Sequence, residues 1–208
     1  MIWLTEKIEF PAPHKATEEG IIALGGDLSV ERLVHAYNKG IFPWYSEGEP
    51  IIWYCPPERM VLFPDELKIS KSMKRLIRKG IFTITENKAF DEVLFNCKHI
   101  IRKDEFGTWI TDDMEQAYME LHKKGVAKSI EVWQEKKLVG GLYGIDLGNG
   151  VFCGESMFSL QSNASKIAFT HLAKSTRYKL IDCQLYTDHL ASLGAREISR
   201  KEFLSFLG

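Results

Sequence analysis

Apolar residues in the first part of the chain recur every three or four positions, which predicts amphipathic helices. Three of these segments begin after a Ser or Thr suited to an N-cap and end just before a Gly. The caps are Ser29, Ser70 and Thr111. We expect four helices here, at residues 29–39, 70–79, 88–99 and 111–124.

Farther along, the pattern changes to short apolar runs at residues 129–133, 138–145 and 151–158. Polar and Gly-containing turns of a few residues separate these runs. Connections this short join antiparallel strands, because parallel neighbours need a long crossover. We therefore predict a three-stranded antiparallel meander.

A helix at residues 163–177 follows, with Asn163 as its candidate N-cap. The apolar run at 180–185 is typical of a buried strand, and short helices are expected near 188–193 and 199–207. Helices, a meander, a long helix and a further strand form an α+β order. At the level of the fold this order resembles the N-acetyltransferase (GNAT-like) arrangement, which by itself gives no function.

Residues 1–57 are rich in turn formers and aromatic residues and contain one clear helix. They predict a small N-terminal α/β domain without a large core of its own. The Pro56-Pro57 pair is the predicted boundary of this domain. We expect two domains, 1–57 and 58–208, the second GNAT-like.

Two polar residues, Asp182 and Gln184, interrupt the last apolar run. Side chains alternate along a strand, so both are predicted on one face. Buried polar groups need hydrogen-bond partners, whether their role is catalytic or structural. The pattern leaves these two roles equally open.

Glu155 follows Gly154 in another apolar run, and a Gly inside a strand can mark a bulge or a close backbone approach. The simpler alternative, a carboxylate facing solvent at a strand end, is favoured by the rarity of buried Glu. Two tryptophans in segments predicted to be loops, Trp44 and Trp109, can stack on nucleic-acid bases or anchor the core.

The predicted helix at 70–79 belongs to a strongly basic segment. Six cations occur in twelve residues without an acid among them: Lys68, Lys71, Lys74, Arg75, Arg78 and Lys79. Such a patch suits phosphates, although a solvated amphipathic face is the commoner outcome.

Composition narrows the class of protein. The 208 residues carry a net charge of −1, so basic character is local. The four cysteines lie far apart without a C-x-x-C, which favours a reducing cytosol over a disulfide framework or zinc site. No apolar stretch is long enough to cross a membrane, and the N-terminus does not resemble a signal peptide.

Ten segments, in this order, resemble the leucyl/phenylalanyl-tRNA–protein transferase family. They are Gly20–Ser29, Gly40–Trp44, Ser70–Arg75, Gly107–Ile110, Ser129–Trp133, Val139–Gly144, Gly154–Ser159, Asn163–Lys166, Ile181–Gln184 and Ser192–Ala195. The match covers nearly the whole chain. One departure is Ile52–Cys55, where the family commonly has two tryptophans and a serine, and this could alter contacts to the tRNA end.

The resemblance implies a bacterial cytoplasmic enzyme that needs neither cofactor nor metal and is expected to be a monomer. It would move Leu or Phe from Leu-tRNA or Phe-tRNA to a protein with N-terminal Lys or Arg, marking that protein for N-end-rule degradation. An enzyme using acetyl-CoA would instead need a Gly-rich phosphate loop after the meander. No glycine occurs between Gly154 and Gly194.

The resemblance also implies roles for individual residues. Asp182 and Gln184 are the catalytic candidates. A neutral amide is a poor proton acceptor, so we expect Gln184 to orient the attacking amine, while Asp182 polarises Gln184 and stabilises the developing ammonium. The alternative is that the proton passes to the ribose leaving group within the substrate. The substrate-binding and tRNA-binding candidates are Glu155 for the aminoacyl α-amino group, Leu142, Cys153, Met157 and Phe169 for the Leu or Phe side chain, Trp44 and Trp109 for the terminal adenosine, and Lys71, Lys74, Arg75 and Arg78 for tRNA phosphates.

Three other functions stay open from the sequence. A CoA-dependent N-acetyltransferase is disfavoured by the missing loop, and a non-catalytic RNA-binding protein by Asp182 and Gln184. A related transferase that acts on acidic N-termini is the closest variant.

Overall fold

A computed structural model describes residues 2–100 and 109–208. The N-terminal part forms a small sheet of four short strands in the order β1-β2-β4-β3. Its elements are β1 (Trp3–Leu4), a 3-10 turn (Pro13–Lys15), β2 (Ile21–Gly25), α1 (Val30–Asn38), β3 (Phe42–Pro43) and β4 (Ile52–Tyr54). We call residues 2–57 the N-terminal lobe.

The rest of the chain contains a seven-stranded sheet, in the order β11-β5-β10-β9-β8-β7-β6. Its strands are β5 (Glu58–Leu62), β6 (Thr83–Glu86), β7 (Ala127–Gln134), β8 (Lys137–Asp146), β9 (Val151–Ser159), β10 (Leu180–Gln184) and β11 (Arg196–Ser199). Strands β7, β8 and β9 pair antiparallel, which confirms the predicted meander. Strand β10 runs parallel to β9 and antiparallel to β5, so it lies inside the sheet.

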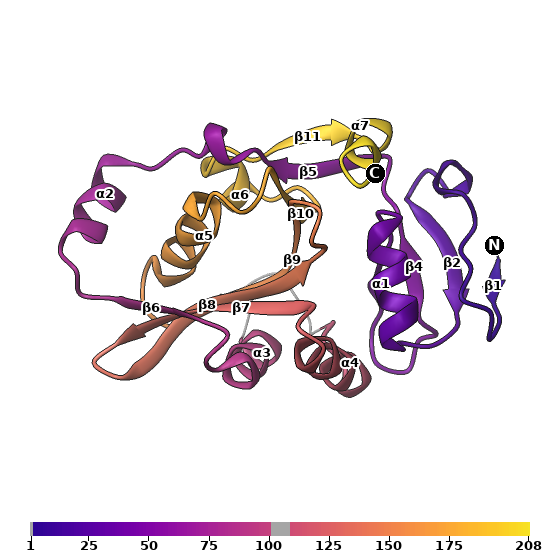
Figure 1. The fold of residues 1–208 in the computed structure, drawn as a ribbon, viewed down its shortest axis with the longest axis horizontal. Coiled ribbons are helices and arrows are strands. Elements are labelled where there is room, and N and C mark those ends of the chain that lie inside the picture. The colour runs from indigo at the N-terminus through magenta and orange to yellow at the C-terminus, as the bar shows by residue number, and fades with distance from the viewer. Residues whose placement is uncertain (1, 101–108) are drawn as a thin grey trace.

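Helices cover both faces of this sheet (Figure 1). They are a 3-10 turn (Pro64–Glu66), α2 (Lys71–Arg78), α3 (Phe90–His99), α4 (Asp112–Lys123), α5 (Ala164–Lys174), α6 (Asp188–Ser192) and α7 (Arg200–Ser205). Helix α5 packs on the opposite face from α3 and α4. Helix α2 lies at the far end of the long axis from the N-terminal lobe.

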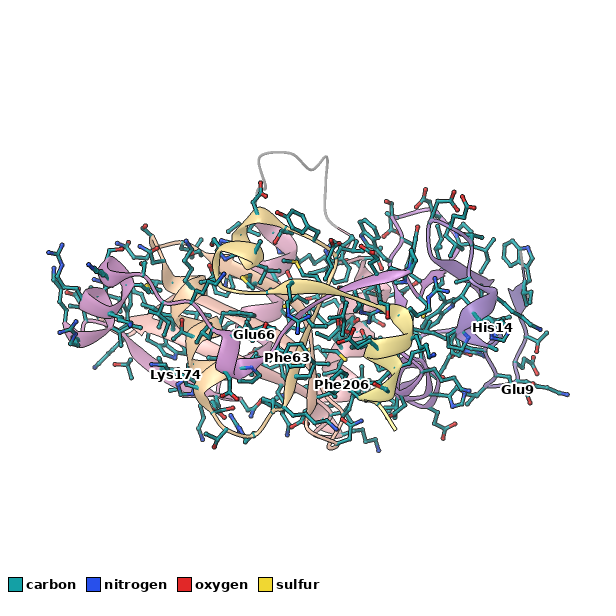
Figure 2. The ribbon with its side chains drawn as sticks, turned by 90° about the horizontal axis from the view of Figure 1, so that it is seen from above. Glu9, His14, Phe63, Glu66, Lys174 and Phe206 are labelled. Carbon is teal, nitrogen blue, oxygen red and sulfur yellow. The ribbon has the colours of Figure 1, made fainter. Side chains whose placement is uncertain are left out.

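The core beneath the N-terminal lobe is shared between the two parts of the chain. Trp53 and Leu33 of the lobe are fully buried in the same apolar cluster as Val61 and Phe203. Residues near the C-terminus also pack against this cluster. Phe206 packs edge to face on Phe63, with ring centroids 5.6 Å apart (Figure 2). The lobe is therefore stabilised by burial against the larger sheet.

Three of the four predicted helix N-caps are confirmed. The hydroxyls of Ser29, Ser70 and Thr111 each accept the backbone N–H three residues on, which confirms these three caps. Asn163 is the exception. It has a left-handed φ of 69°, and its side chain makes no capping bond. Instead its amide donates to the hydroxyl of Ser162, so Asn163 stands at the predicted N-cap position but does not cap the helix with its side chain.

Seven strands were missing from the prediction: β1, β2, β3, β4, β5, β6 and β11. They have two to five residues each and lack a clear apolar alternation. The two sheets separate between β4 and β5, at Pro56-Pro57. The assignment of 1–57 and 58–208 as separate domains stays a prediction.

Candidate active site

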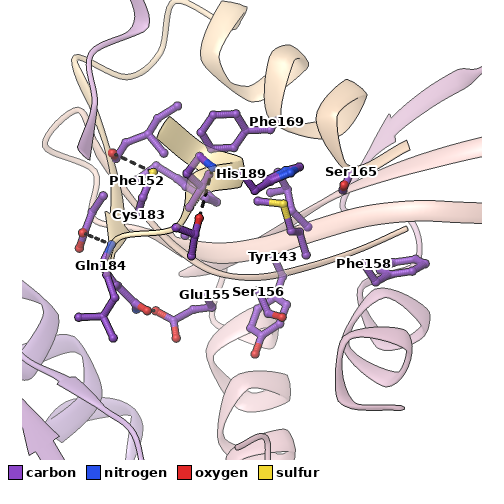
Figure 3. A pocket seen from close by; sticks show the side chains of 18 of the residues that line it. Tyr143, Phe152, Glu155, Ser156, Phe158, Ser165, Phe169, Cys183, Gln184 and His189 are labelled. Atoms are coloured by element: carbon purple, nitrogen blue, oxygen red, sulfur yellow. Dashed lines mark hydrogen bonds between the residues drawn. The ribbon is translucent and has the colours of Figure 1, made fainter. Parts of the chain in front are cut away.

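A pocket of about 550 Å³ lies where the N-terminal lobe meets β9, β10, α5 and α6. Figure 3 shows side chains that line it. One part of the lining is apolar and includes Leu142, Met157 and Phe169. Another part is polar and includes Glu155 and Gln184. Apolar walls with a few convergent polar groups are the usual composition of a ligand site.

The predicted apolar residues reach this pocket with one exception. Leu142 and Phe169 are buried beside it, on β8 and α5. Cys153 does not line it, and its assignment to the side-chain pocket is corrected. This thiol is buried in the cluster shared with the N-terminal lobe, and burial raises its pKa well above the usual value.

Two β-bulges shape the polar part. On β9, Tyr143 pairs with Ser156 and Gly144 pairs with Gly154, so Glu155 is the extra residue between them. The Gly154 signal for a bulge is thereby confirmed. Bulges re-aim side chains and are frequent beside active sites.

The second bulge follows Asp182 on β10. Asp182 pairs with Val61 and Gln184 pairs with Met60, which leaves Cys183 as the extra residue. Gln184 has a φ of 61°, so the regular alternation predicted for this strand is wrong at Gln184. The backbone N–H of Gln184 donates to Oδ1 of Asp182 at 2.9 Å, and this bond stabilises the bulge.

Asp182 is fully buried and forms an ion pair with Arg59 of β5. Nε and Nη2 of Arg59 donate to the two carboxylate oxygens at 2.8 and 2.7 Å. The guanidinium lies between the rings of Phe42 and Phe203, 4.7 and 4.5 Å from their centroids. Its Nη1 donates to the Gly40 carbonyl at 2.9 Å, which links the pair to the N-terminal lobe.

This arrangement changes the expected role of Asp182. Its carboxylate faces Arg59 and a backbone N–H, so the predicted polarisation of the Gln184 amide has no direct side-chain contact to act through. Arg59 was not among the residues predicted for the site. The sequence signal that could have indicated it is a cation directly before the apolar run Met60–Leu62.

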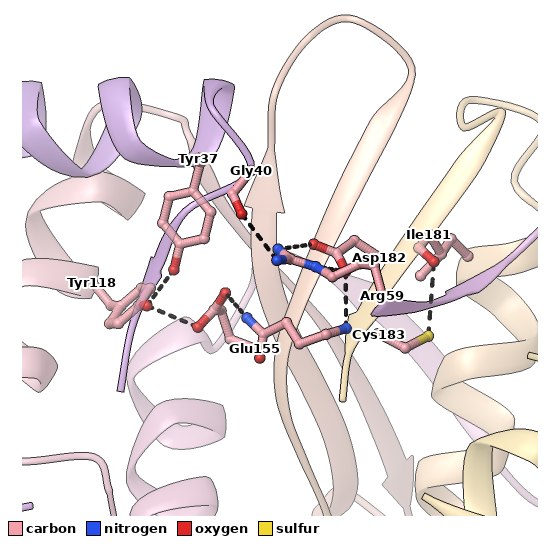
Figure 4. A network of polar contacts seen from close by, with 9 residues as sticks. Tyr37, Gly40, Arg59, Tyr118, Glu155, Ile181, Asp182 and Cys183 are labelled. Atoms are coloured by element: carbon pink, nitrogen blue, oxygen red, sulfur yellow. Dashed lines mark hydrogen bonds and ion pairs between the residues drawn. The ribbon is translucent and has the colours of Figure 1, made fainter. Parts of the chain in front are cut away.

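Glu155 has different partners. Its Oε1 accepts from Nε2 of Gln184 at 2.8 Å, and its Oε2 accepts from the Tyr118 hydroxyl at 2.8 Å. The Tyr118 and Tyr37 hydroxyls lie 2.5 Å apart (Figure 4). Burial raises the pKa of Glu155 from 4.5 to about 7, against the opposing effect of the tyrosine hydrogen bonds. The solvent-facing alternative for Glu155 is therefore wrong.

Trp44 and Trp109 both line the pocket, from the segment after β3 and from just before α4. Two residues of the Gly107–Ile110 motif, Gly107 and Thr108, lie outside the described residues. The cations of α2 lie elsewhere: Lys71, Lys74, Arg75 and Arg78 are exposed. None of these four forms an ion pair with another described residue.

Within residues 2–100 and 109–208, no three His, Cys, Asp or Glu side chains gather as a metal site would require. In the same part of the chain, no helix has the length and apolar character needed to cross a membrane.

Comparisons with known proteins give one consistent match. The family described as leucyl/phenylalanyl-tRNA protein transferase matches residues 61–208, and its N-terminal domain matches residues 26–57. A leucyl/phenylalanyl-tRNA--protein transferase of Flavobacterium johnsoniae is 60% identical, over 100% of this chain and 99% of that protein. One of Flavobacterium psychrophilum is 55% identical over the same shares.

Two solved structures that match this chain are distant from it in sequence. FemX has a TM-score of 0.48 at 11% identity, covering 82% of this chain and 66% of that chain. A GCN5-related N-acetyltransferase from Kribbella flavida has a TM-score of 0.38 at 10% identity, covering 78% and 58%. At these scores neither carries an argument about fold or function.

Proposed function

Because the chain belongs to the leucyl/phenylalanyl-tRNA–protein transferase family, we propose that it moves Leu or Phe from aminoacyl-tRNA to the N-terminal Lys or Arg of acceptor proteins. The observation that carries this proposal is the pocket in which an apolar wall meets Glu155 and Gln184. Such a pocket suits an amino acid with an apolar side chain and a charged α-amino group.

The Leu or Phe side chain binds beside Leu142, Met157 and Phe169. Met157 suits this task because a flexible thioether adapts to both an aliphatic and an aromatic ligand. The α-ammonium of the aminoacyl group contacts Glu155, whose carboxylate has no cationic ion-pair partner among the described residues. Trp44 and Trp109 hold the terminal adenosine by stacking.

The reaction is aminolysis of an ester. The α-amine of the acceptor attacks the aminoacyl carbonyl, and the ribose oxygen leaves. Gln184 orients the amine through its amide oxygen, since its Nε2 already donates to Glu155. Asp182 and Arg59 act by fixing the bulge from which Gln184 projects. Positioning of this kind can supply much of the acceleration of a two-substrate reaction.

The exposed cations of α2 bind phosphates of the tRNA outside the pocket. Helix α2 has Lys71, Lys74, Arg75 and Arg78 on eight residues, unpaired with described acids. We place the catalytic part in a GNAT-like domain, because the meander β7–β9 is followed by α5 and then by the parallel strand β10. The protein acts as a monomer in the cytoplasm, and its products enter N-end-rule degradation.

One assay tests the proposed function. Labelled Leu-tRNA is incubated with the protein and with peptides that begin with Arg, Lys, Asp or Glu. We expect transfer to the Arg and Lys peptides only. Transfer to the Asp and Glu peptides would show the specificity of the related transferase that acts on acidic N-termini. No transfer to any peptide would contradict the proposal.

A further inference from the structure

The transfer reaction releases a proton from the attacking nitrogen, and this proton either passes directly to the ribose oxygen or is taken by a protein group at the site. Gln184 is neutral and a very poor base. The carboxylate of Asp182 accepts hydrogen bonds from Nε and Nη2 of Arg59 and from the backbone N–H of Gln184. His189 also lines the pocket, and its buried Nε2 has no hydrogen-bond partner in the described part of the chain. Glu155 differs from His189 because it is bonded to Gln184, the residue proposed to orient the amine, and this makes Glu155 the better-placed acceptor.

We propose that Glu155 is the group that accepts the proton of the attacking amine, with Tyr118 and Tyr37 as the residues that hold its carboxylate in place. The inference rests on the proposed aminoacyl transfer and goes beyond the binding role given to Glu155 above. Both roles fit one carboxylate. In the tetrahedral intermediate, the attacking nitrogen is bonded to the former carbonyl carbon and the aminoacyl α-nitrogen is one atom farther away.

The contacts of Glu155 support a base rather than a structural anion. Oε1 lies 2.8 Å from Nε2 of Gln184, the residue proposed to orient the amine. Oε2 lies 2.8 Å from the Tyr118 hydroxyl, which donates its single proton to Glu155. Tyr37 therefore donates to Tyr118 in turn, across 2.5 Å. Each carboxylate oxygen keeps a further lone pair for substrate.

The electrostatic surroundings agree with this role. The groups that act on Glu155 are Tyr118 of α4, Tyr37 of α1, Asp182 of β10 and Arg59 of β5, with Cys153 on its own strand. Burial is the largest effect and raises the pKa of Glu155 to about 7. A base with a pKa near the working pH combines a useful ionised fraction with a useful affinity for the proton.

Every proton in the proposed step has a donor and an acceptor. The neutral amine forms the C–N bond, and the ester carbonyl oxygen takes the negative charge. Glu155 removes a proton from the new ammonium. The tetrahedral intermediate then collapses, the bond from carbon to the ribose oxygen breaks, and that oxygen receives the proton back from Glu155. The net change is transfer of one proton from amine to alcohol, with Glu155 regenerated.

The test is a single-turnover rate of leucine transfer, measured from pH 5.5 to 9 with Leu-tRNA and Arg-peptide both saturating. Glu155→Gln keeps the shape of the side chain and removes the base, and we expect a rate loss of about 100-fold or more. The affinity for Leu-tRNA is measured separately by filter binding. A Glu155→Gln rate within a few-fold of wild type, with only the affinity reduced, would leave a binding role alone and overturn the proposal.

Tyr118→Phe gives the second readout. The Tyr118 hydrogen bond lowers the pKa of Glu155, so its removal raises that pKa. We expect the acidic limb of the rate profile to move to higher pH by about one unit. The pKa of the peptide's own amine does not respond to this change. An acidic limb that stays in place would overturn the assignment.

A matched control is Glu131→Gln. Glu131 is fully buried on β7 and bonded to Thr85 and Ser129, but it does not line the pocket. We expect its acidic limb to coincide with that of the wild type. If the wild-type protein transfers no leucine at all, the proposed function itself fails, which is a different outcome from an active enzyme that tolerates Glu155→Gln.

Discussion

Two buried carboxylates on neighbouring strands of the same sheet have opposite surroundings. Asp182 on β10 forms a two-bond ion pair with Arg59, between the rings of Phe42 and Phe203. Glu155 on β9 has no such pair among the described residues and is held by Tyr118 and Gln184. Both lie at or beside a bulge that disturbs the regular strand.

The difference shows how one side-chain chemistry can do two jobs. A carboxylate that is fully paired with a guanidinium keeps its charge and fixes neighbouring groups, but has little capacity left for a ligand. A carboxylate held only by neutral donors is poised to bind a cation or to take a proton. This difference supports the proposed roles, positioning for Asp182 and direct contact with substrate for Glu155.

The largest expected effect comes from Asp182→Asn. This change leaves the buried charge of Arg59 without its partner, and breaking a buried pair from one side costs roughly 3–5 kcal/mol. We expect the free energy of unfolding, measured in urea, to fall by this amount. If Asp182 acts by fixing Gln184, as proposed, the transfer rate should fall by the same factor at every pH.

A double variant separates charge from packing. Arg59→Met with Asp182→Leu removes both charges, so it should unfold less easily than Asp182→Asn alone. It should still transfer leucine poorly, since the bulge loses its side-chain acceptor. If Asp182→Asn is as stable as wild type, or loses less activity at high pH than at low pH, the positioning role is contradicted.

Asp182→Asn should destabilise the protein, whereas Glu155→Gln should stabilise it near pH 7, because the variant has no carboxylate to ionise in the core. The pKa of Glu155 rises from 4.5 to about 7 on folding, so the folded state binds this proton more tightly than the unfolded state. The resulting stability is complete below pH 4.5 and is lost as the pH rises toward 7, at about 1.4 kcal/mol per unit. In the Glu155→Gln variant, the free energy of unfolding should not fall in this way between pH 4.5 and 7. Urea unfolding of both proteins at several pH values measures the difference, and parallel curves would count against a raised pKa.

The smallest effect on stability is expected on α2. Lys74→Ala with Arg75→Ala removes two exposed charges and should change the free energy of unfolding by less than about 0.5 kcal/mol. It should raise the Michaelis constant for tRNA and reduce the log–log salt slope by about 2. The same change at Lys123 and Lys124, which are exposed at the end of α4, is the control. Equal salt slopes for the two double variants would remove α2 from the tRNA site.

Local signals predicted much of the fold. Helix caps act within three residues, so Ser29, Ser70 and Thr111 could be read directly. The strands of the meander are eight to ten residues long, with enough positions to show a pattern. The missed strands are short and are stabilised mainly by neighbours distant in sequence. For example, β5 lies between β10 and β11.

The candidate site divides in the same way. Asp182, Gln184 and Glu155 stood out because polar residues interrupted apolar runs. Their partners did not. Arg59 is 123 positions from Asp182, and Tyr37 is 81 positions from Tyr118. No periodicity or spacing in the chain links residues so far apart.

The sequence by itself determined which segments form helices and which polar groups must be buried, because both follow from local propensity and from the cost of placing polar atoms in apolar strands. Only the tertiary structure decided which carboxylate meets a cation. Chain folding brings Arg59 to Asp182 and the two tyrosines to Glu155, and two bulges turn Glu155 and Gln184 toward one another. Electrostatic pairing depends on distances of a few ångströms between distant segments, and those distances exist only in the folded chain.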